Sequence, residues 1–179
     1  IGPIELLLAH TTPPGPFHPP AYLLFLAVSS LAGFRSFLDH QIWSCILGAA
    51  TIVLVGFTGR AIAGRRVGLL AAFIVTIYPN FWFHDSVVMS ETLIMFTTTL
   101  VIWVAYRFWQ APGVRRSVVL GAAVGLATLT RAESILLVVV LILPLAYVLR
   151  DLDLRARLKL FAVTVAVTLV SVSPWVIFN

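Results

Sequence analysis

The residues best suited to chemistry in this sequence lie in three short polar stretches between long apolar runs. In the first stretch, His18 is separated from Tyr22 by two prolines and an alanine. An imidazole and a phenol can both donate hydrogen bonds to phosphate or sugar oxygens, so both are candidate substrate-binding residues. The prolines fix the backbone ahead of an apolar helix, and a rigid helix start without a ligand is the simpler alternative.

The second stretch contains His84 and Asp85, with Glu91 six residues further on. Carboxylates are hard oxygen ligands for divalent cations and can also orient an acceptor hydroxyl. We therefore take Asp85 and Glu91 as candidate catalytic residues and candidate ligands of a divalent cation, and His84 as a candidate substrate-binding residue. Glu91 opens an apolar segment, where it would be partly desolvated, although it would also complement a helix N-terminus.

The third stretch is a very short turn that carries Arg131 and Glu133 between two apolar segments. A guanidinium can hold a phosphate through two parallel hydrogen bonds, so a lipid phosphate is a reasonable partner for Arg131. An ion pair with Glu133, or an ordinary headgroup contact, explains the arginine equally well. Both residues are candidate substrate-binding residues.

The elements that position these residues must be membrane helices. The 179 residues are 60% apolar and only 11% charged, whereas average soluble chains carry about 25% charged residues. A helix needs roughly 20 mainly apolar residues to cross a bilayer, and six segments approach or meet that length: residues 41–59, 67–83, 90–106, 117–130, 134–149 and 160–178. The predicted fold is an all-α bundle of about six transmembrane helices.

The start of the chain has a different pattern. Prolines break residues 1–18, and the apolar run that follows, residues 19–34, is short. We expect an extracytoplasmic loop followed by an interfacial or short membrane helix, with the six spans within residues 41–178. The chain has no initiator Met or signal peptide pattern and stops as though a further loop should follow, so we expect one membrane-embedded module, incomplete at both ends.

The basic residues indicate the orientation. If loops alternate across six spans, one side collects ten of the twelve Lys and Arg residues, and that side is predicted to be cytoplasmic. They are Arg60, Arg65, Arg66, Arg107, Arg115, Arg116, Arg150, Arg155, Arg157 and Lys159. The second and third polar stretches then face outward from the plasma (inner) membrane. The first stretch faces the same way if residues 19–34 do not cross the membrane, as we expect, and lies in the cytoplasm if they do. Topology thus explains the net charge of +5 better than nucleic-acid binding does.

Several classes of protein are poorly supported. The single cysteine, Cys45, leaves no intrachain disulfide or thiolate metal cluster to build. Motifs typical of nucleotide-phosphate loops, zinc peptidases and serine hydrolases are missing from the sequence. We interpret the glycine-rich run at residues 121–125 as a close contact between helices.

Three motifs together resemble a known family. The sequence reads HPPAY at residues 18–22, GRRVGLLAA at 64–72 and GLATLTR at 125–131. These are similar to motifs of the multispanning GT-C glycosyltransferases that use polyprenyl-phosphate sugars, including protein O-mannosyltransferases and lipid A aminoarabinose transferases. A short acidic motif of that family corresponds to Ser90 and Glu91 in this sequence.

The resemblance implies inverting transfer of a sugar from a polyprenyl phosphate to a hydroxyl of a lipid, glycan or protein at the extracytoplasmic face. Glu91 would be the second acidic residue of the site, Arg131 would neutralise the carrier phosphate, and His18 would lie beside the donor. The family's main catalytic aspartate would precede Ile1, so this chain is expected to be inactive alone. Metal use differs among relatives, which leaves the divalent cation open.

Two other functions are compatible with a membrane bundle. A transporter or flippase for an anionic or lipid-linked solute would typically show inverted repeats and charges near the bilayer midplane. We detect no repeat, and the charges gather near the ends of the apolar segments. A noncatalytic assembly subunit would need only packing surfaces, and it predicts that replacing Glu91 or Arg131 is harmless.

Overall fold

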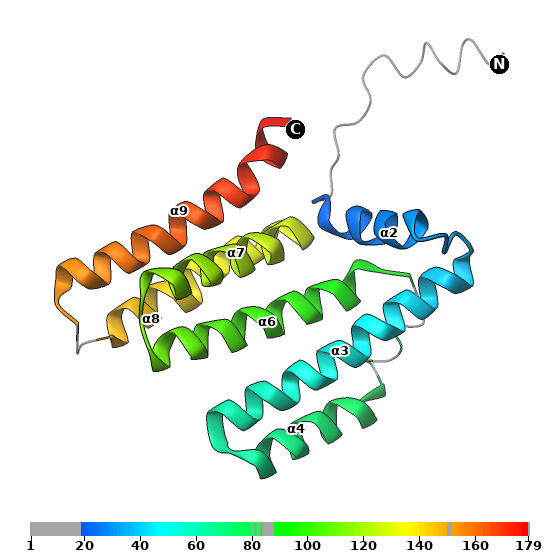
Figure 1. The fold of residues 1–179 in the computed structure, drawn as a ribbon, viewed down its shortest axis with the longest axis horizontal. Coiled ribbons are helices and arrows are strands. Elements are labelled where there is room, and N and C mark those ends of the chain that lie inside the picture. The colour runs from blue at the N-terminus through cyan, green and yellow to red at the C-terminus, as the bar shows by residue number, and fades with distance from the viewer. Residues whose placement is uncertain (1–18, 80, 82, 84–87, 150–151, 179) are drawn as a thin grey trace.

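The computed structural model describes residues 19–79, 81, 83, 88–149 and 152–178, which form helices and no strand. The α-helices are α2 (Ala21–Leu31), α3 (Phe37–Ala63), α4 (Arg65–Ile77), α6 (Ser90–Gln110), α7 (Val114–Thr130), α8 (Leu143–Val148) and α9 (Leu154–Phe178). A 3₁₀ helix, η1 (Ala132–Leu136), and a π-helix, η2 (Val138–Ile142), connect α7 to α8. The predicted all-α membrane fold is confirmed (Figure 1).

Within the described part of the chain, three helices are long and apolar enough to cross a membrane: Phe37–Ala63, Ser90–Gln110 and Leu154–Ile177. The other predicted spans are shorter as helices, since α4 has 13 residues and α7 has 17. The segment 134–149 is divided among η1, η2 and α8. With 11 residues, α2 extends about 17 Å, too short to cross about 30 Å of hydrocarbon.

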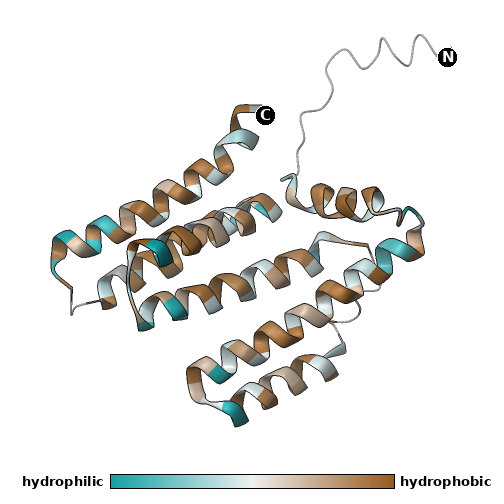
Figure 2. Ribbon diagram, in the orientation of Figure 1, coloured by the Kyte–Doolittle hydropathy of each residue, from teal (hydrophilic) through white to brown (hydrophobic). Residues whose placement is uncertain are grey.

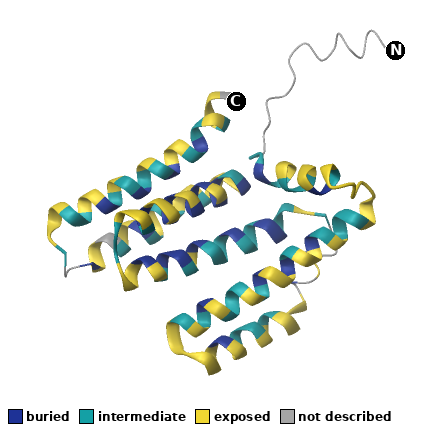
Figure 3. Ribbon diagram, in the orientation of Figure 1, coloured by how far each residue is buried: buried dark blue, intermediate teal, exposed yellow. Residues whose placement is uncertain are grey.

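The long helices pack in a row. Contacts join α9 to α7, α7 to α6, α6 to α3 and α3 to α4, as Figure 1 shows from one edge of the molecule to the other. Buried residues concentrate along α6 and α7, at the middle of this row (Figure 3). Val101 of α6 and Leu120 and Val124 of α7 are fully buried and form the centre of the core.

Apolar side chains also cover the outside of the row. Leu31 is 86% exposed, Val140 71% and Val170 70%, and Figure 2 shows hydrophobic residues along most of the helical surface with polar residues nearer the helix ends. Large exposed apolar surfaces are costly in water and normal in hydrocarbon. The exposed surface therefore matches a membrane-embedded protein.

Local signals fix where the helices begin and turn. Ser36 and Asp39 form a reciprocal capping box at the start of α3, with the Asp39 amide donating to Ser36 Oγ at 3.1 Å and the Ser36 amide donating to Asp39 Oδ2 at 2.9 Å. Gly64 separates α3 from α4 with φ of +88°, a conformation that glycine adopts without the steric cost other residues incur. The turn folds α4 back along α3.

Small residues allow the helices to approach closely. A Cβ atom at Gly121 would lie 2.5 Å from the Thr164 carbonyl oxygen of α9, and Thr168 Oγ1 donates to the Gly121 carbonyl at 3.1 Å. A Cβ at Gly68 of α4 would lie 2.5 Å from the Gly56 carbonyl oxygen of α3. The close contact predicted for residues 121–125 is confirmed, and it holds α7 against α9.

Candidate active site

The antiparallel α6–α7 hairpin brings two predicted site residues together. Glu91 lies in the first turn of α6, and Arg131 directly follows the last residue of α7. Arg131 Nη2 lies 3.7 Å from Glu91 Oε1, with side-chain exposures of 50% and 24%. This distance exceeds the usual 2.7–3.2 Å of an N–H···O hydrogen bond. The guanidinium is therefore attracted electrostatically to the carboxylate, and its N–H groups remain available to donate hydrogen bonds to a second anion.

Helix α2 contributes a phenol to the same site. Pro20 precedes α2 and its carbonyl accepts the Leu24 amide at 2.9 Å, which places Tyr22 in the first turn. The Tyr22 hydroxyl is buried and has no hydrogen-bond partner among the described residues. Burial, and secondarily the Glu91 charge, raises the pKa of Tyr22 to about 12. The phenol is therefore neutral at physiological pH and can donate a hydrogen bond.

Contacts with α3 hold α2 in place. The rings of Tyr22 and Phe25 stack with centroids 6.3 Å apart, and Phe25 lies 5.9 Å from the Trp43 ring of α3. Fully buried Ser29 and His40 Nδ1 share a hydrogen bond of 2.8 Å. These contacts fix the short helix although it is connected to α3 by a glycine-containing turn.

A cleft of about 660 Å³ opens between these elements. Its lining includes four of the seven predicted site residues, Tyr22, Glu91, Arg131 and Glu133. The remaining lining residues are their neighbours in the same three elements and turns: Pro19, Leu23, Val88, Met89, Ser90, Thr130 and Ala132. Residues from three polar or proline-containing stretches, far apart in the sequence, thus line one cleft.

An apolar groove adjoins the cleft and shares Arg131 and Glu133 with it. This groove, of about 500 Å³, runs over Ile94 and Thr98 of α6 and over η1 and η2, where its lining residues are Ser134, Leu136, Leu137 and Val140. Sequence reasoning missed the groove. The spacing could have revealed part of it, because Ile94 and Thr98 follow Glu91 by three and seven residues and therefore share its helix face.

The structure does not describe the other three predicted site residues. His18, His84 and Asp85 lie outside the described residues, so their proposed roles stay predictions. Among the described residues, no group of three His, Cys, Asp or Glu side chains is placed to hold a metal ion. Because Asp85 is outside that set, the divalent cation also stays a prediction. Arg131 pairs with Glu91 in place of its sequence neighbour Glu133, which is exposed.

The arrangement suits an amphiphilic anion. A guanidinium and a neutral phenol offer donors to an anionic or sugar oxygen, while Glu91 offers an acceptor. The groove beside Arg131 offers apolar surface to a hydrocarbon chain. One molecule with a charged head and an apolar tail could therefore occupy both hollows.

Comparison with known proteins identifies the family. Residues 17–178 match the family model described as dolichyl-phosphate-mannose-protein mannosyltransferase, and this range contains the cleft, the groove and all three motifs described above. No curated protein and no solved structure matches the sequence. The matched range covers most of the chain, which therefore belongs to the dolichyl-phosphate-mannose-protein mannosyltransferase family of GT-C membrane glycosyltransferases.

Proposed function

We propose that this chain takes part in inverting transfer of a sugar from a polyprenyl-phosphate donor to a hydroxyl of a lipid, glycan or protein acceptor. The observation that carries the proposal is the position of Arg131, which lines both the polar cleft and the apolar groove. The reaction takes place at the extracytoplasmic face of the plasma membrane, following the predicted topology. The family match over residues 17–178 supports this class of reaction.

The donor lies across the two hollows. Arg131 binds the phosphate, the prenyl chain follows the groove over Ile94 and Leu137, and the sugar lies in the cleft beside Tyr22. During transfer, the bond between the anomeric carbon and the phosphate oxygen breaks and the phosphate gains negative charge. A fixed guanidinium in a partly dehydrated site stabilises that charge more strongly than water does.

Glu91 is then best suited to position Arg131. In an inverting displacement, the acceptor oxygen attacks from the face opposite the leaving group, and the carboxylate that takes its proton lies on that opposite face. A carboxylate in contact with the phosphate-binding arginine lies on the leaving-group side. Glu91 therefore orients the guanidinium, and a different carboxylate accepts the hydroxyl proton.

The test replaces Arg131 in the full-length protein. Transfer from a synthetic polyprenyl-phosphate sugar should fall by about a hundredfold or more in Arg131→Ala, because stabilisation of the departing phosphate is lost. Arg155→Ala is the matched control, since Arg155 is an exposed arginine of α9 that lines neither hollow. Near-normal transfer by a folded Arg131→Ala protein would remove Arg131 from the mechanism. Lipid translocation without sugar transfer by the wild type would favour the transporter alternative.

A further inference from the structure

We propose that a second site, at the opposite end of the α6–α7 hairpin, binds the phosphate headgroup of an anionic phospholipid. Three arginines, Arg107, Arg115 and Arg116, line one hollow of about 360 Å³ together with apolar residues. The apolar lining residues are Trp103, Val104 and Val119. We refer to these six residues as the arginine pocket.

Two of the arginines are held in defined positions. Arg116 Nη1 donates to the carbonyl oxygens of Arg107 and Ala111, each at 2.8 Å, and so satisfies carbonyls at the C-terminal end of α6 that have no partner within the helix. The Arg107 guanidinium carbon lies 5.9 Å from the centre of the Trp103 ring, within reach of a cation–π interaction. Holding these charges before binding lowers the entropic cost of capturing an anion.

Among the described residues, no carboxylate balances the charge of the arginine pocket. Its described lining contains three arginines and three apolar residues, and the ion pair found in that part of the chain, between Glu91 and Arg131, lies at the other end of α6. Exposed Arg115 adds a third positive charge to the two that are held. Like charges around a small hollow repel one another, and a phosphate relieves that repulsion while accepting parallel N–H···O bonds.

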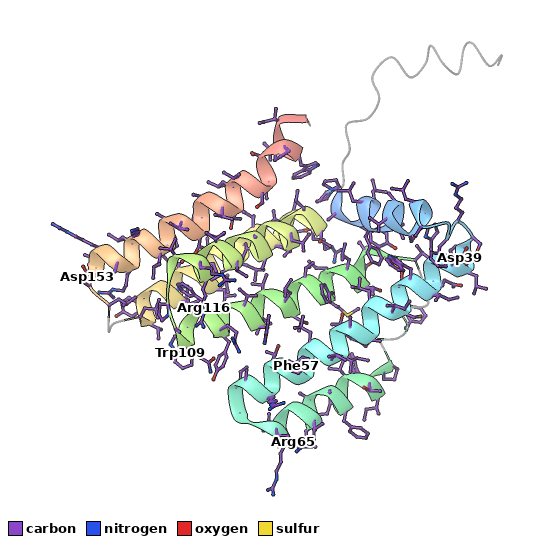
Figure 4. The ribbon with its side chains drawn as sticks, in the orientation of Figure 1. Asp39, Phe57, Arg65, Trp109, Arg116 and Asp153 are labelled. Carbon is purple, nitrogen blue, oxygen red and sulfur yellow. The ribbon has the colours of Figure 1, made fainter. Side chains whose placement is uncertain are left out.

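The location favours a lipid as the source of the phosphate. Arg107 follows Glu91 by sixteen residues in α6, or about 24 Å of helix, which places the pocket near the far side of a bilayer core of about 30 Å. The adjacent Tyr106 and Trp109 rings, 5.5 Å apart, match the aromatic residues found at membrane interfaces. Figure 4 labels Trp109 and Arg116 at this end of the hairpin. Basic pockets between helices on the cytoplasmic side bind acidic lipid headgroups.

If the three arginines only contribute to the general excess of basic residues on cytoplasmic loops, a different result is expected. That excess depends on the number of Lys and Arg residues and requires no particular geometry. A binding site requires the arginines of this pocket and tolerates loss of equivalent charge elsewhere. Arg155 and Lys159 of α9 provide the comparison, because both are exposed and neither lines the pocket.

The experiment titrates the detergent-solubilised full-length protein with phosphatidylglycerol and with phosphatidylcholine of the same acyl chains, followed by native mass spectrometry. The test variant is Arg107→Gln/Arg115→Gln, which leaves the α6-capping Arg116 in place. The control variant is Arg155→Gln/Lys159→Gln, with the same change in charge. We expect phosphatidylglycerol affinity to fall about tenfold in the test variant and to stay near the wild-type value in the control. Phosphatidylcholine should bind weakly to all three proteins.

Four results would overturn the proposal. Equal losses in the two double variants would show diffuse surface charge, and unchanged affinity in both would exclude the arginine pocket. Binding of soluble glycerol phosphate as tight as that of phosphatidylglycerol would exclude a lipid site. If the glutamine variant does not fold, Arg107→Lys/Arg115→Lys replaces it. Affinity should still fall severalfold because lysine lacks the parallel donors of arginine, and unchanged affinity would also contradict the site.

Discussion

The prediction of the site was based mainly on single polar residues in apolar surroundings. Tyr22, Glu91, Arg131 and Glu133 stand out because polar groups are expensive near hydrocarbon and persist where they have a role. All four line one cleft. The partner of Arg131 could not be predicted in the same way, because Glu133 is two residues away while Glu91 is forty residues away. Only the antiparallel packing of α6 on α7 brings Glu91 close.

The Tyr22 hydroxyl gives a prediction at this scale. Tyr22→Phe keeps the ring that stacks on Phe25 and removes a buried hydroxyl that has no partner among the described residues. Loss of one hydrogen bond to the bound donor should raise KM about three- to tenfold, whereas the thermal stability of the protein should hold or rise. Kinetics with the purified full-length protein and a thermal unfolding curve test both points. Unchanged KM would mean that the hydroxyl does not contact the donor.

The same residue predicts a pH profile. Since burial raises the pKa of Tyr22 to about 12, the phenol stays protonated between about pH 6 and 9. The ratio of KM values for Tyr22→Phe and wild type should therefore be constant across that range. Tyrosine in the unfolded chain has a pKa of about 10, and below that pH the raised pKa of Tyr22 contributes fully to the stability of the folded state. This contribution is lost as the pH rises towards 12. Tyr22→Phe should lack that alkaline loss.

At the scale of elements, the positions of apolar segments were predictable and their helical regularity was not. The run at residues 134–149 has the composition of a spanning helix, yet it forms a 3₁₀ turn, a π turn and short α8. Pro144 provides a physical reason for the π turn at Val138–Ile142, because its ring clashes with the carbonyl four residues earlier and it has no amide to donate. Hydropathy counts side chains and does not register this backbone effect.

The α7–α9 contact gives a prediction for an element. A Cβ at Gly121 would overlap the Thr164 carbonyl at 2.5 Å and Val167 Cβ at 2.9 Å, so Gly121→Ala should lower stability by about 1–3 kcal/mol. Gly113 has no atom within 4 Å of its added Cβ, and Gly113→Ala should change stability by less than about 1 kcal/mol. Thermal unfolding in detergent compares the two. Equal melting temperatures would contradict the close contact.

The whole molecule has two chemically different ends. The Glu91–Arg131 cleft lies at one end of the α6–α7 hairpin, and the arginine pocket lies at the other, about 24 Å away along α6. Between them, the exposed surface is mainly apolar. The two proposals together place a lipid-linked donor in one leaflet and acidic headgroups in the opposite leaflet. The excess of basic residues at the second end predicts which leaflet is cytoplasmic.

Sidedness is therefore the prediction that belongs to the whole molecule. Single cysteines at Glu133→Cys and Arg155→Cys, both exposed positions, are placed in full-length protein that carries Cys45→Ser. In intact cells, a membrane-impermeant maleimide should label the cysteine at 133, and it should label the cysteine at 155 only after permeabilisation. Labelling of both after permeabilisation controls for reactivity. The reverse pattern would place the cleft in the cytoplasm, where donor recognition and acceptor access would have to occur from the inner leaflet, and it would contradict the proposed extracytoplasmic reaction.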